Sequence, residues 1–137
     1  MYKKLLLIDD DSDEQFFFSE ALKEINASVK FLFAENAKEG VQLIRFLSPD
    51  LVFIDINMPA INGLECLELI MNNKDIQLPN IIIYSTSIDN DLCRTALKKG
   101  AVDCIKKQNS IHLLADALKN LLITGSPVLH LVSADKH

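Results

Sequence analysis

LLLIDD at residues 5–10 and LVFID at residues 51–55 each place a short apolar run directly before acidic residues. An unbroken apolar run of this length is typical of a parallel strand that is buried on both faces of a sheet. The carboxyl ends of such strands open onto the ligand crevice of an α/β sheet. We therefore expect Asp9, Asp10 and Asp55 to lie together at that edge, where they would suit a bound cation.

The rest of the chain continues the alternation of apolar runs with amphipathic segments. Strands are expected near 4–8, 29–34, 51–55, 80–84 and 102–106, and helices near 12–26, 37–47, 63–73, 89–99 and 110–123. Strands that alternate with helices predict βα units on a parallel sheet with helices on both faces. The fold class indicated is α/β, in one doubly wound domain.

Local signals mark several helix ends. Ser12 and Asn36 are each followed three residues later by Gln or Glu, which is the spacing of a capping box. Ser87 is expected to cap the fourth helix. Gly100 stands where a residue with left-handed backbone would end that helix.

The composition narrows the class of protein. The 137 residues are 49% hydrophobic and 24% charged, as in a soluble domain with a proper core, and the net charge is −5. This charge argues against nucleic acid as a partner. No apolar run reaches the ~18 residues that a membrane span requires. The three widely spaced cysteines indicate reduced, core-facing thiols in a cytoplasmic protein.

Each acidic residue also has an ordinary structural role to set against metal binding. Asp9 and Asp10 could favour the following helix dipole, and Asp55 could begin a turn. Other polar groups leave the sheet at the same edge, namely Ser85 to Ser87 after the fourth strand and Lys106 with Lys107 after the fifth. A pocket that gathers carboxylates, hydroxyls and an ammonium group is therefore expected there.

At this point the chain resembles the receiver domain of two-component response regulators, in its single-domain, chemotaxis-receiver-like form. The resemblance covers residues 3–123 and implies a flavodoxin-like, five-stranded parallel sheet of order 2-1-3-4-5. It also implies a phosphorelay in which a sensor histidine kinase or a histidine phosphotransfer protein donates a phosphoryl group. The landmarks are Ile8-Asp9-Asp10, Asp55 to Pro59, Asn62-Gly63, Ser85, Gly100-Ala101 and Lys107.

The resemblance assigns roles to the acidic residues. Asp55 would be the phosphoacceptor, whose carboxylate attacks phosphorus to form an acyl phosphate. Mg²⁺ would offset the repulsion between the two anionic groups. Asp10, Asp55 and the backbone carbonyl of Asn57 would ligate the ion directly, and Asp9 largely through water. A site with few carboxylates suits Mg²⁺, which keeps several of its waters.

The resemblance also assigns the remaining polar groups. Lys107 would pair with the phosphoryl oxygens as a mobile point charge, and Ser85 would donate a hydroxyl hydrogen bond to them. Lys107 is preferred because it lies seven residues after Gly100. Lys106 is the competing choice if the strand register slips by one residue.

Two positions depart from the family pattern. Cys104 stands where most members have the aromatic residue of the phosphorylation switch, and Gln108 stands where most have proline. The Lys107–Gln108 peptide bond is therefore expected to be trans. We hypothesise that the face at about 88–120 still forms the output surface for a downstream protein target, with smaller or differently coupled motion.

Three other functions compete with the phosphoacceptor. A flavodoxin-like electron carrier is disfavoured because three consecutive acids after the first strand would repel the FMN phosphate. A phosphatase with an aspartate nucleophile would leave Asp55 unexplained. A pseudo-receiver, which binds partners without turning over phosphate, is the main alternative. We expect a receiver domain at 1–123 and a tail at 124–137 without an output domain, acting through protein contacts rather than as an enzyme.

Overall fold

A computed structural model describes residues 2–124 of the chain. Within this range five strands alternate with five helices along the sequence. The strands are β1 (Lys4–Ile8), β2 (Lys30–Ala34), β3 (Leu51–Asp55), β4 (Asn80–Ser85) and β5 (Asp103–Lys106). The helices are α1 (Ser12–Glu24), α2 (Ala37–Leu47), α3 (Gly63–Met71), α4 (Asn90–Lys98) and α5 (Ile111–Thr124). Each bound lies within two residues of its predicted position.

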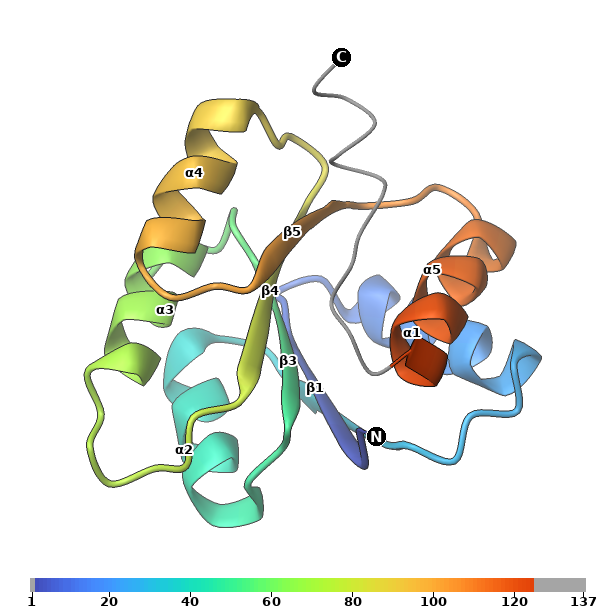
Figure 1. The fold of residues 1–137 in the computed structure, drawn as a ribbon, viewed down its shortest axis with the longest axis horizontal. Helices are drawn as coiled ribbons and strands as arrows, with labels where there is room; N and C mark the ends of the chain where they lie inside the picture. The colour runs from blue at the N-terminus through green and yellow to red at the C-terminus, as the bar shows by residue number, and fades with distance from the viewer. Residues whose placement is uncertain (1, 125–137) are drawn as a thin grey trace.

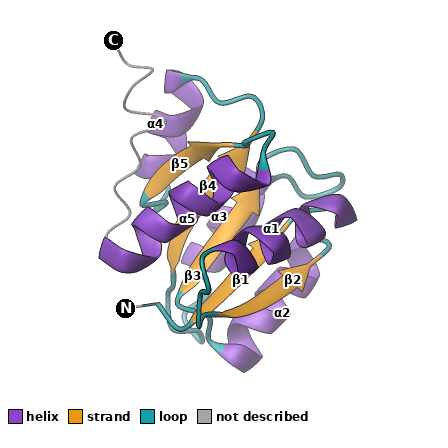
Figure 2. Ribbon diagram, turned by 90° about the vertical axis from the view of Figure 1, so that its right-hand side faces the viewer, coloured by secondary structure: helices purple, strands orange, loops and turns teal. Residues whose placement is uncertain are grey.

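The strands form one parallel sheet in the order β2-β1-β3-β4-β5. Helices α1 and α5 cover one face of the sheet, and α2, α3 and α4 cover the other (Figures 1 and 2). The predicted doubly wound fold and its strand order are therefore confirmed. β1 and β3 lie side by side, which brings the chain segments that follow them to the same edge of the sheet.

The core consists of two apolar clusters, one on each face of the sheet. In β1, Leu5 and Leu7 pack toward α1 and α5, while Leu6 and Ile8 pack toward α2, α3 and α4. This alternation follows from the two-residue repeat of a strand. All four side chains are fully buried, and each contributes about 1.5–3 kcal/mol by leaving water. The strand ends are thus held firmly by apolar packing beneath them.

Aromatic side chains link α1 to the sheet. The ring of Phe18 in α1 lies 5.2 Å from the rings of Phe53 and Tyr84, both in edge-to-face geometry, and 5.8 Å from the stacked ring of Phe31. Phe53 and Tyr84 also meet edge to face at 5.8 Å. Such pairs add about 0.5–1.5 kcal/mol beyond the area that they bury. Tyr84 is therefore fixed in position by α1 and β3.

The structure corrects two of the predicted caps. The N-cap of α1 is Asp11, whose carboxylate accepts a hydrogen bond from the Asp13 N–H at 2.9 Å, so the capping box predicted at Ser12 is wrong. The chain still has extended backbone at Asp11, and Ser12 is already helical. The cap of α4 is Asp89 rather than Ser87, because the helix begins later than predicted.

Asn36 caps α2 with one of the two hydrogen bonds of the predicted capping box, and the helix end predicted at Gly100 is confirmed. The Asn36 side chain accepts a hydrogen bond from the Glu39 N–H at 2.8 Å. Gly100 follows α4 with φ +117°, a backbone conformation that favours glycine. The predicted tail at 124–137 lies outside the described residues, apart from Thr124 at the end of α5.

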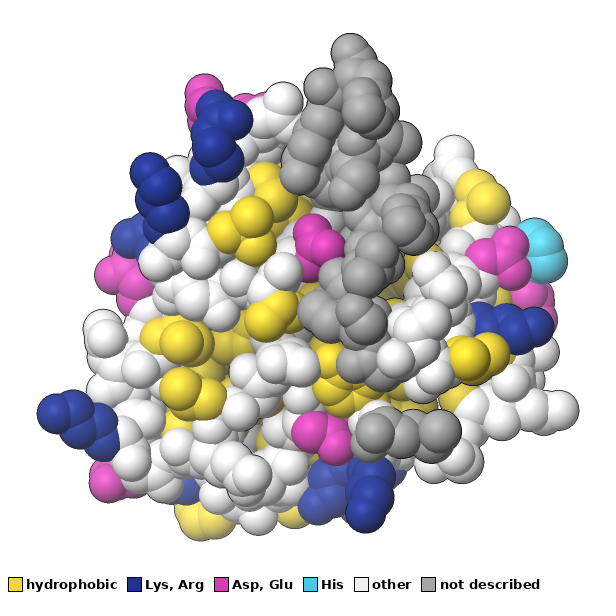
Figure 3. Space-filling model, in the orientation of Figure 1, with side chains coloured by type: hydrophobic (Ala, Val, Ile, Leu, Met, Phe, Trp, Pro, Cys, Tyr) yellow, Lys and Arg dark blue, Asp and Glu magenta, His cyan; other side chains and the backbone are white. Residues whose placement is uncertain are grey.

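The surface and the cysteines complete the description. All three cysteines lie in the core, as predicted. No helix among residues 2–124 combines the length and the apolar character of a membrane span. On the face shown in Figure 3, Lys and Arg side chains are scattered along the rim, with acidic side chains among them, and form no single basic patch.

Candidate functional site

Three carboxylates meet where β1 and β3 end. One oxygen from each of Asp9, Asp10 and Asp55 lies within 4.8 Å of the other two. Asp9 and Asp55 are buried, with 0% and 4% of their surface exposed, whereas Asp10 is exposed. The Asp9 carboxylate is oriented by the Asp11 N–H, which donates to it at 3.0 Å. The predicted grouping of the three acids is therefore present, and hard oxygen donors of this kind suit Mg²⁺.

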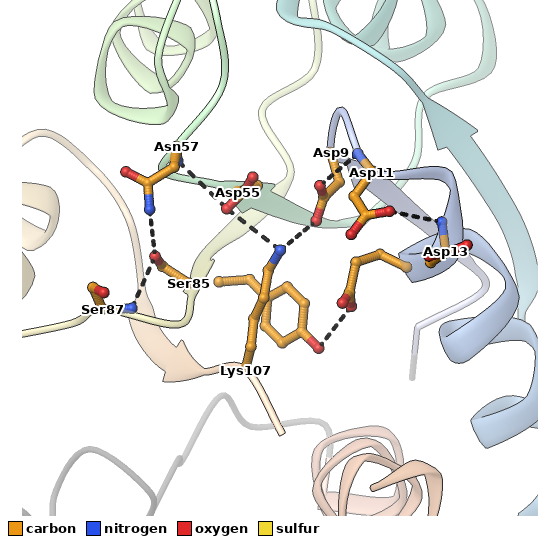
Figure 4. Close-up of polar contacts among 10 residues, drawn as sticks. Asp9, Asp11, Asp13, Asp55, Asn57, Ser85, Ser87 and Lys107 are labelled. Atoms are coloured by element: carbon orange, nitrogen blue, oxygen red, sulfur yellow. Dashed lines mark hydrogen bonds and ion pairs between the residues drawn. The ribbon is translucent and has the colours of Figure 1, made fainter. Parts of the chain in front are cut away.

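Lys107 supplies the positive charge that faces these carboxylates. Its Nζ donates to Asp9 Oδ2 at 2.8 Å and lies 3.6 Å from Asp55 Oδ1. Figure 4 shows its side chain reaching toward the space between the two acids. Only 11% of the side chain is exposed. The Lys107 N–H donates to the Ser85 carbonyl at 2.8 Å, which continues the β4–β5 pairing, whereas Lys106 is exposed. The structure thus brings Lys107 rather than Lys106 to the acids.

Burial and crowding of like charges shift the pKa values in this cluster. Burial, followed by the charge of Asp9, raises the pKa of Asp55 from 3.8 to about 6, although Lys107 opposes the rise. Burial alone would lower the pKa of Lys107, but its hydrogen bond to Asp9 and the surrounding carboxylates raise the pKa above its ordinary value. The site therefore carries an excess of negative charge that one ammonium group does not balance.

Ser85 closes the site from β4. The side chain is fully buried, and its hydroxyl oxygen accepts hydrogen bonds from the Asn57 amide at 3.4 Å and from the Ser87 N–H at 3.3 Å. The Asn57 N–H donates to Asp55 Oδ1, also at 3.4 Å (Figure 4). A hydroxyl that accepts two N–H bonds still has its own hydrogen to donate. Asn57 thus links Ser85 to Asp55 within one hydrogen-bonded group.

The loop between β3 and α3 fixes the backbone at Asp55 by close packing. Ile56 and Met58 are almost fully buried, at 8% and 7% exposure, and anchor the loop in the core. Gly63 packs so closely that a Cβ atom there would lie 2.6 Å from Ile56 Cα and would also collide with the Asp55 carbonyl. Asn62 and Glu65 form a reciprocal capping box at the start of α3. The Asn-Gly pair therefore serves both the helix cap and the close approach.

Two residues of the site were missed by the sequence reasoning. The Tyr84 hydroxyl donates to Glu14 Oε1 at 3.3 Å, and the Lys107 Nζ lies 5.4 Å from the centroid of the Tyr84 ring. Burial raises the pKa of Glu14, with Lys107 opposing the rise. The available signals were an acid in the first turn of α1 and an aromatic residue directly before Ser85.

The two departures from the family pattern are Cys104, within β5, and Gln108, directly after Lys107. Cys104 is fully buried, and its Sγ lies 3.9 Å from the Cys93 carbonyl in α4, within the reach of a weak S–H hydrogen bond. The Lys107–Gln108 peptide bond is trans, as predicted, because no cis bond occurs among residues 2–124. The Gln108 amide donates to the Lys106 carbonyl at 2.8 Å and closes a turn after β5.

Comparison with known proteins identifies the family. Residues 5–119 match the family model described as the response regulator receiver domain. The chain belongs to this family. The match covers the first four helices and all five strands apart from the first residue of β1. The resemblance inferred from the motifs is therefore confirmed.

Curated relatives are similar over most of this chain. It is 31% identical to the probable C4-dicarboxylate response regulator DctR of Bacillus subtilis, over 85% of this chain and 50% of DctR. It is 33% identical to a protein-glutamate methylesterase/protein-glutamine glutaminase of Geobacillus kaustophilus, over 76% of this chain and 30% of that protein. The chain thus spans between about a third and a half of the length of these relatives.

Solved structures agree with the fold. The response regulator domain of Thermotoga maritima CheB superposes with a TM-score of 0.76 at 25% identity, over 94% of this chain and 99% of that domain. The chemotaxis protein CheY4 of Vibrio cholerae superposes with a TM-score of 0.75 at 18% identity, over 88% of this chain and 98% of CheY4. Receiver domains bind Mg²⁺ at an acidic pocket and interact with histidine kinases and downstream effectors. The cluster of Asp9, Asp10 and Asp55 could hold such an ion.

Proposed function

We propose that this receiver domain is a phosphoacceptor and that Asp55 receives the phosphoryl group. The observation that carries the proposal is the convergence of four strand ends on one point. Asp55 and Ser85 end β3 and β4, and Asp9 and Lys107 directly follow β1 and β5. The four residues lie together in an acidic pocket. Helix capping does not account for this group, because the N-cap of α1 is Asp11 and neither Asp9 nor Asp55 caps a helix.

The proposed donor is a phosphohistidine on a sensor histidine kinase or on a histidine phosphotransfer protein. An Asp55 carboxylate oxygen attacks phosphorus, the phosphorus–nitrogen bond breaks, and the imidazole leaves with the bonding electron pair. Lys107, already 3.6 Å from Asp55 Oδ1, offers its ammonium group to the phosphoryl oxygens. Ser85 donates its hydroxyl hydrogen to the same oxygens.

Mg²⁺ fits the donor set of this pocket. Two buried carboxylates and one exposed carboxylate share a single ammonium, which leaves negative charge for a cation to balance. Asp9, Asp10, Asp55 and the Asn57 backbone carbonyl are the proposed holders. The bound ion would offset the repulsion between the attacking carboxylate and the incoming phosphoryl group. The same fold occurs in the CheX–CheY–BeF₃–Mg²⁺ complex of Borrelia burgdorferi, with a TM-score of 0.72 at 21% identity.

Radiolabelled acetyl phosphate tests this proposal without a cognate kinase. We expect label to enter the protein only in the presence of Mg²⁺ and to be lost in Asp55→Asn. Asp75→Asn is the matched control, because Asp75 is an exposed acid outside the pocket. Label retained in Asp55→Asn would refute the site. A parent protein that takes up no label would favour the pseudo-receiver, which binds partners without phosphate turnover.

A further inference from the structure

A chain of contacts leads from the acidic pocket to α1. Lys107 Nζ binds Asp9 at 2.8 Å and lies above the ring of Tyr84, 5.4 Å from its centroid. The Tyr84 hydroxyl in turn donates to Glu14 Oε1 at 3.3 Å. Glu14 belongs to the first turn of α1. A cation, an aromatic ring and a carboxylate thus follow one another from the pocket to the helix.

We propose that Tyr84 and Glu14 are positioning residues for Lys107, and that through them the phosphoryl state of Asp55 is transmitted to α1. The proposal rests on the function proposed above, since it takes Asp55 as the phosphoacceptor. It adds a route on the face of α1 and α5 to the output surface expected at about 88–120.

The positioning role follows from the rigidity of the ring. A lysine side chain is a flexible stem that carries a point charge, so its position depends on what surrounds it. The Tyr84 ring is fully buried and held edge to face by Phe18 and Phe53. Its face attracts an ammonium through the ring quadrupole. A hydroxyl that donates to the Glu14 carboxylate also leaves more electron density on the ring, which strengthens that attraction.

The transmitting role follows from what a phosphoryl group would change. Its oxygens would draw Lys107 away from Asp9 and shift the ammonium over the Tyr84 ring. The Tyr84–Glu14 hydrogen bond, at 3.3 Å, exceeds the usual O–H···O range of about 2.5–3.0 Å, so a small displacement decides whether it tightens or breaks. Glu14 would carry that change into the first turn of α1.

Core packing is the competing explanation for Tyr84. A buried tyrosine hydroxyl normally finds a hydrogen-bond partner, and Glu14 could be no more than that partner. If Tyr84 serves packing alone, its ring is needed in the core, but its environment should not change when Asp55 is phosphorylated. The two explanations therefore differ in whether Tyr84 senses the state of Asp55, and that response can be observed directly.

Tyrosine fluorescence provides the first test. The chain has two tyrosines and no tryptophan, so Tyr2→Phe leaves Tyr84 as the only tyrosine emitter. Tyr2 accepts a hydrogen bond from Asn80 where β4 begins, at the opposite edge of the sheet from the acidic pocket. Beryllofluoride with Mg²⁺ serves as the phosphoryl mimic. We expect the Tyr84 emission to change saturably as beryllofluoride binds, because a carboxylate that accepts the phenol hydrogen quenches the emission of the ring. In Glu14→Gln this change should be at least halved.

Phosphorylation kinetics provide the second test. Tyr84→Phe keeps the ring and removes the hydroxyl, and Glu14→Gln keeps the size of the acceptor. Each should slow labelling by acetyl phosphate about two- to fivefold, the scale of a weakened cation–π contact. The double variant should be no slower than the slower single variant, because both remove the same link. Glu20→Gln, which alters another acid of α1, should label at the parental rate.

The outcomes separate this proposal from the proposed function. Tyr84 emission that does not change, while fluorine NMR shows beryllofluoride bound, would overturn transmission through Tyr84. Parental labelling rates in both single variants would overturn the positioning role. In either case, label at Asp55 of the parent protein would continue to support the phosphoacceptor. Absence of label in the parent would instead refute the function on which the proposal rests.

Discussion

Replacement of Asp55 by asparagine should stabilise this protein at neutral and higher pH when Mg²⁺ is absent. Asp55 is 4% exposed and shares its pocket with Asp9, so its ionised carboxylate is unfavourable in the folded state. Asp55→Asn keeps nearly the same shape and removes the charge. The effect depends on pH, because the folded protein favours the protonated form of Asp55.

The magnitude follows from the pKa. Burial and the charge of Asp9 raise the pKa of Asp55 from 3.8 to about 6. The folded protein therefore binds this proton more tightly than the unfolded chain does. The corresponding stability is fully present below pH 3.8 and is lost as the pH rises through about 6. A difference of about two pH units, at about 1.4 kcal/mol each, makes the loss about 3 kcal/mol.

Urea unfolding followed by far-UV circular dichroism measures this effect. With EDTA present, the free energy of unfolding of Asp55→Asn relative to the parent should increase by about 2.5 kcal/mol between pH 4 and pH 8, because pH 4 already lies just above the unfolded pKa of 3.8. Asp75→Asn makes the same change in net charge at an exposed position and should show no such increase. Added Mg²⁺ should stabilise the parent more than Asp55→Asn. A stability difference that is the same at both pH values, or that favours the parent at pH 8, would refute the argument.

Three further substitutions test the parts of the site. Lys107→Met removes the ammonium that is paired with Asp9. Calorimetric titration should then show Mg²⁺ binding about tenfold tighter. This change lies within the repulsion of about 1–4 kcal/mol expected between two positive charges at 4 Å. Unchanged Mg²⁺ affinity would contradict this competition. Gly63→Ala places a Cβ against the backbone at Asp55 and should cost about 2 kcal/mol or more in urea unfolding and slow labelling by acetyl phosphate. Parental stability would show that the loop adjusts freely. Asn62→Ala removes one half of the capping box and should cost about 1 kcal/mol with labelling unchanged, so slower labelling would speak against a purely structural cap.

The fold was predictable because its main signals are local and repeated. Apolar runs that alternate with amphipathic segments predicted all ten elements to within two residues. The strand order came from the resemblance, since periodicity alone does not specify which strands pair. The caps at Ser12 and Ser87 failed for a local reason. Several polar residues stand side by side before each helix, and the cap is the one at which the backbone is still extended before it turns helical.

The site was predictable where it depends on strand ends. The ends of β1, β3, β4 and β5 meet at one edge, so their polar residues had to lie close together. The choice of Lys107 over Lys106 required the spacing from Gly100. The contact between Glu14 and Tyr84 was not predicted, because it depends on the rotation of α1 about its axis and on its position on the sheet. Sequence spacing does not contain that information.

The salt bridge between Lys107 and Asp9 gives the pocket a counter-ion that is attached to the chain. A tethered group has an effective concentration that dilution of the protein cannot lower. Mg²⁺ would therefore have to exceed a threshold set by the protein itself before it could take over Asp9. A phosphoryl group that draws Lys107 aside would lower that threshold. Mg²⁺ and the phosphoryl group would therefore favour each other's binding, because each weakens the hold of Lys107 on Asp9.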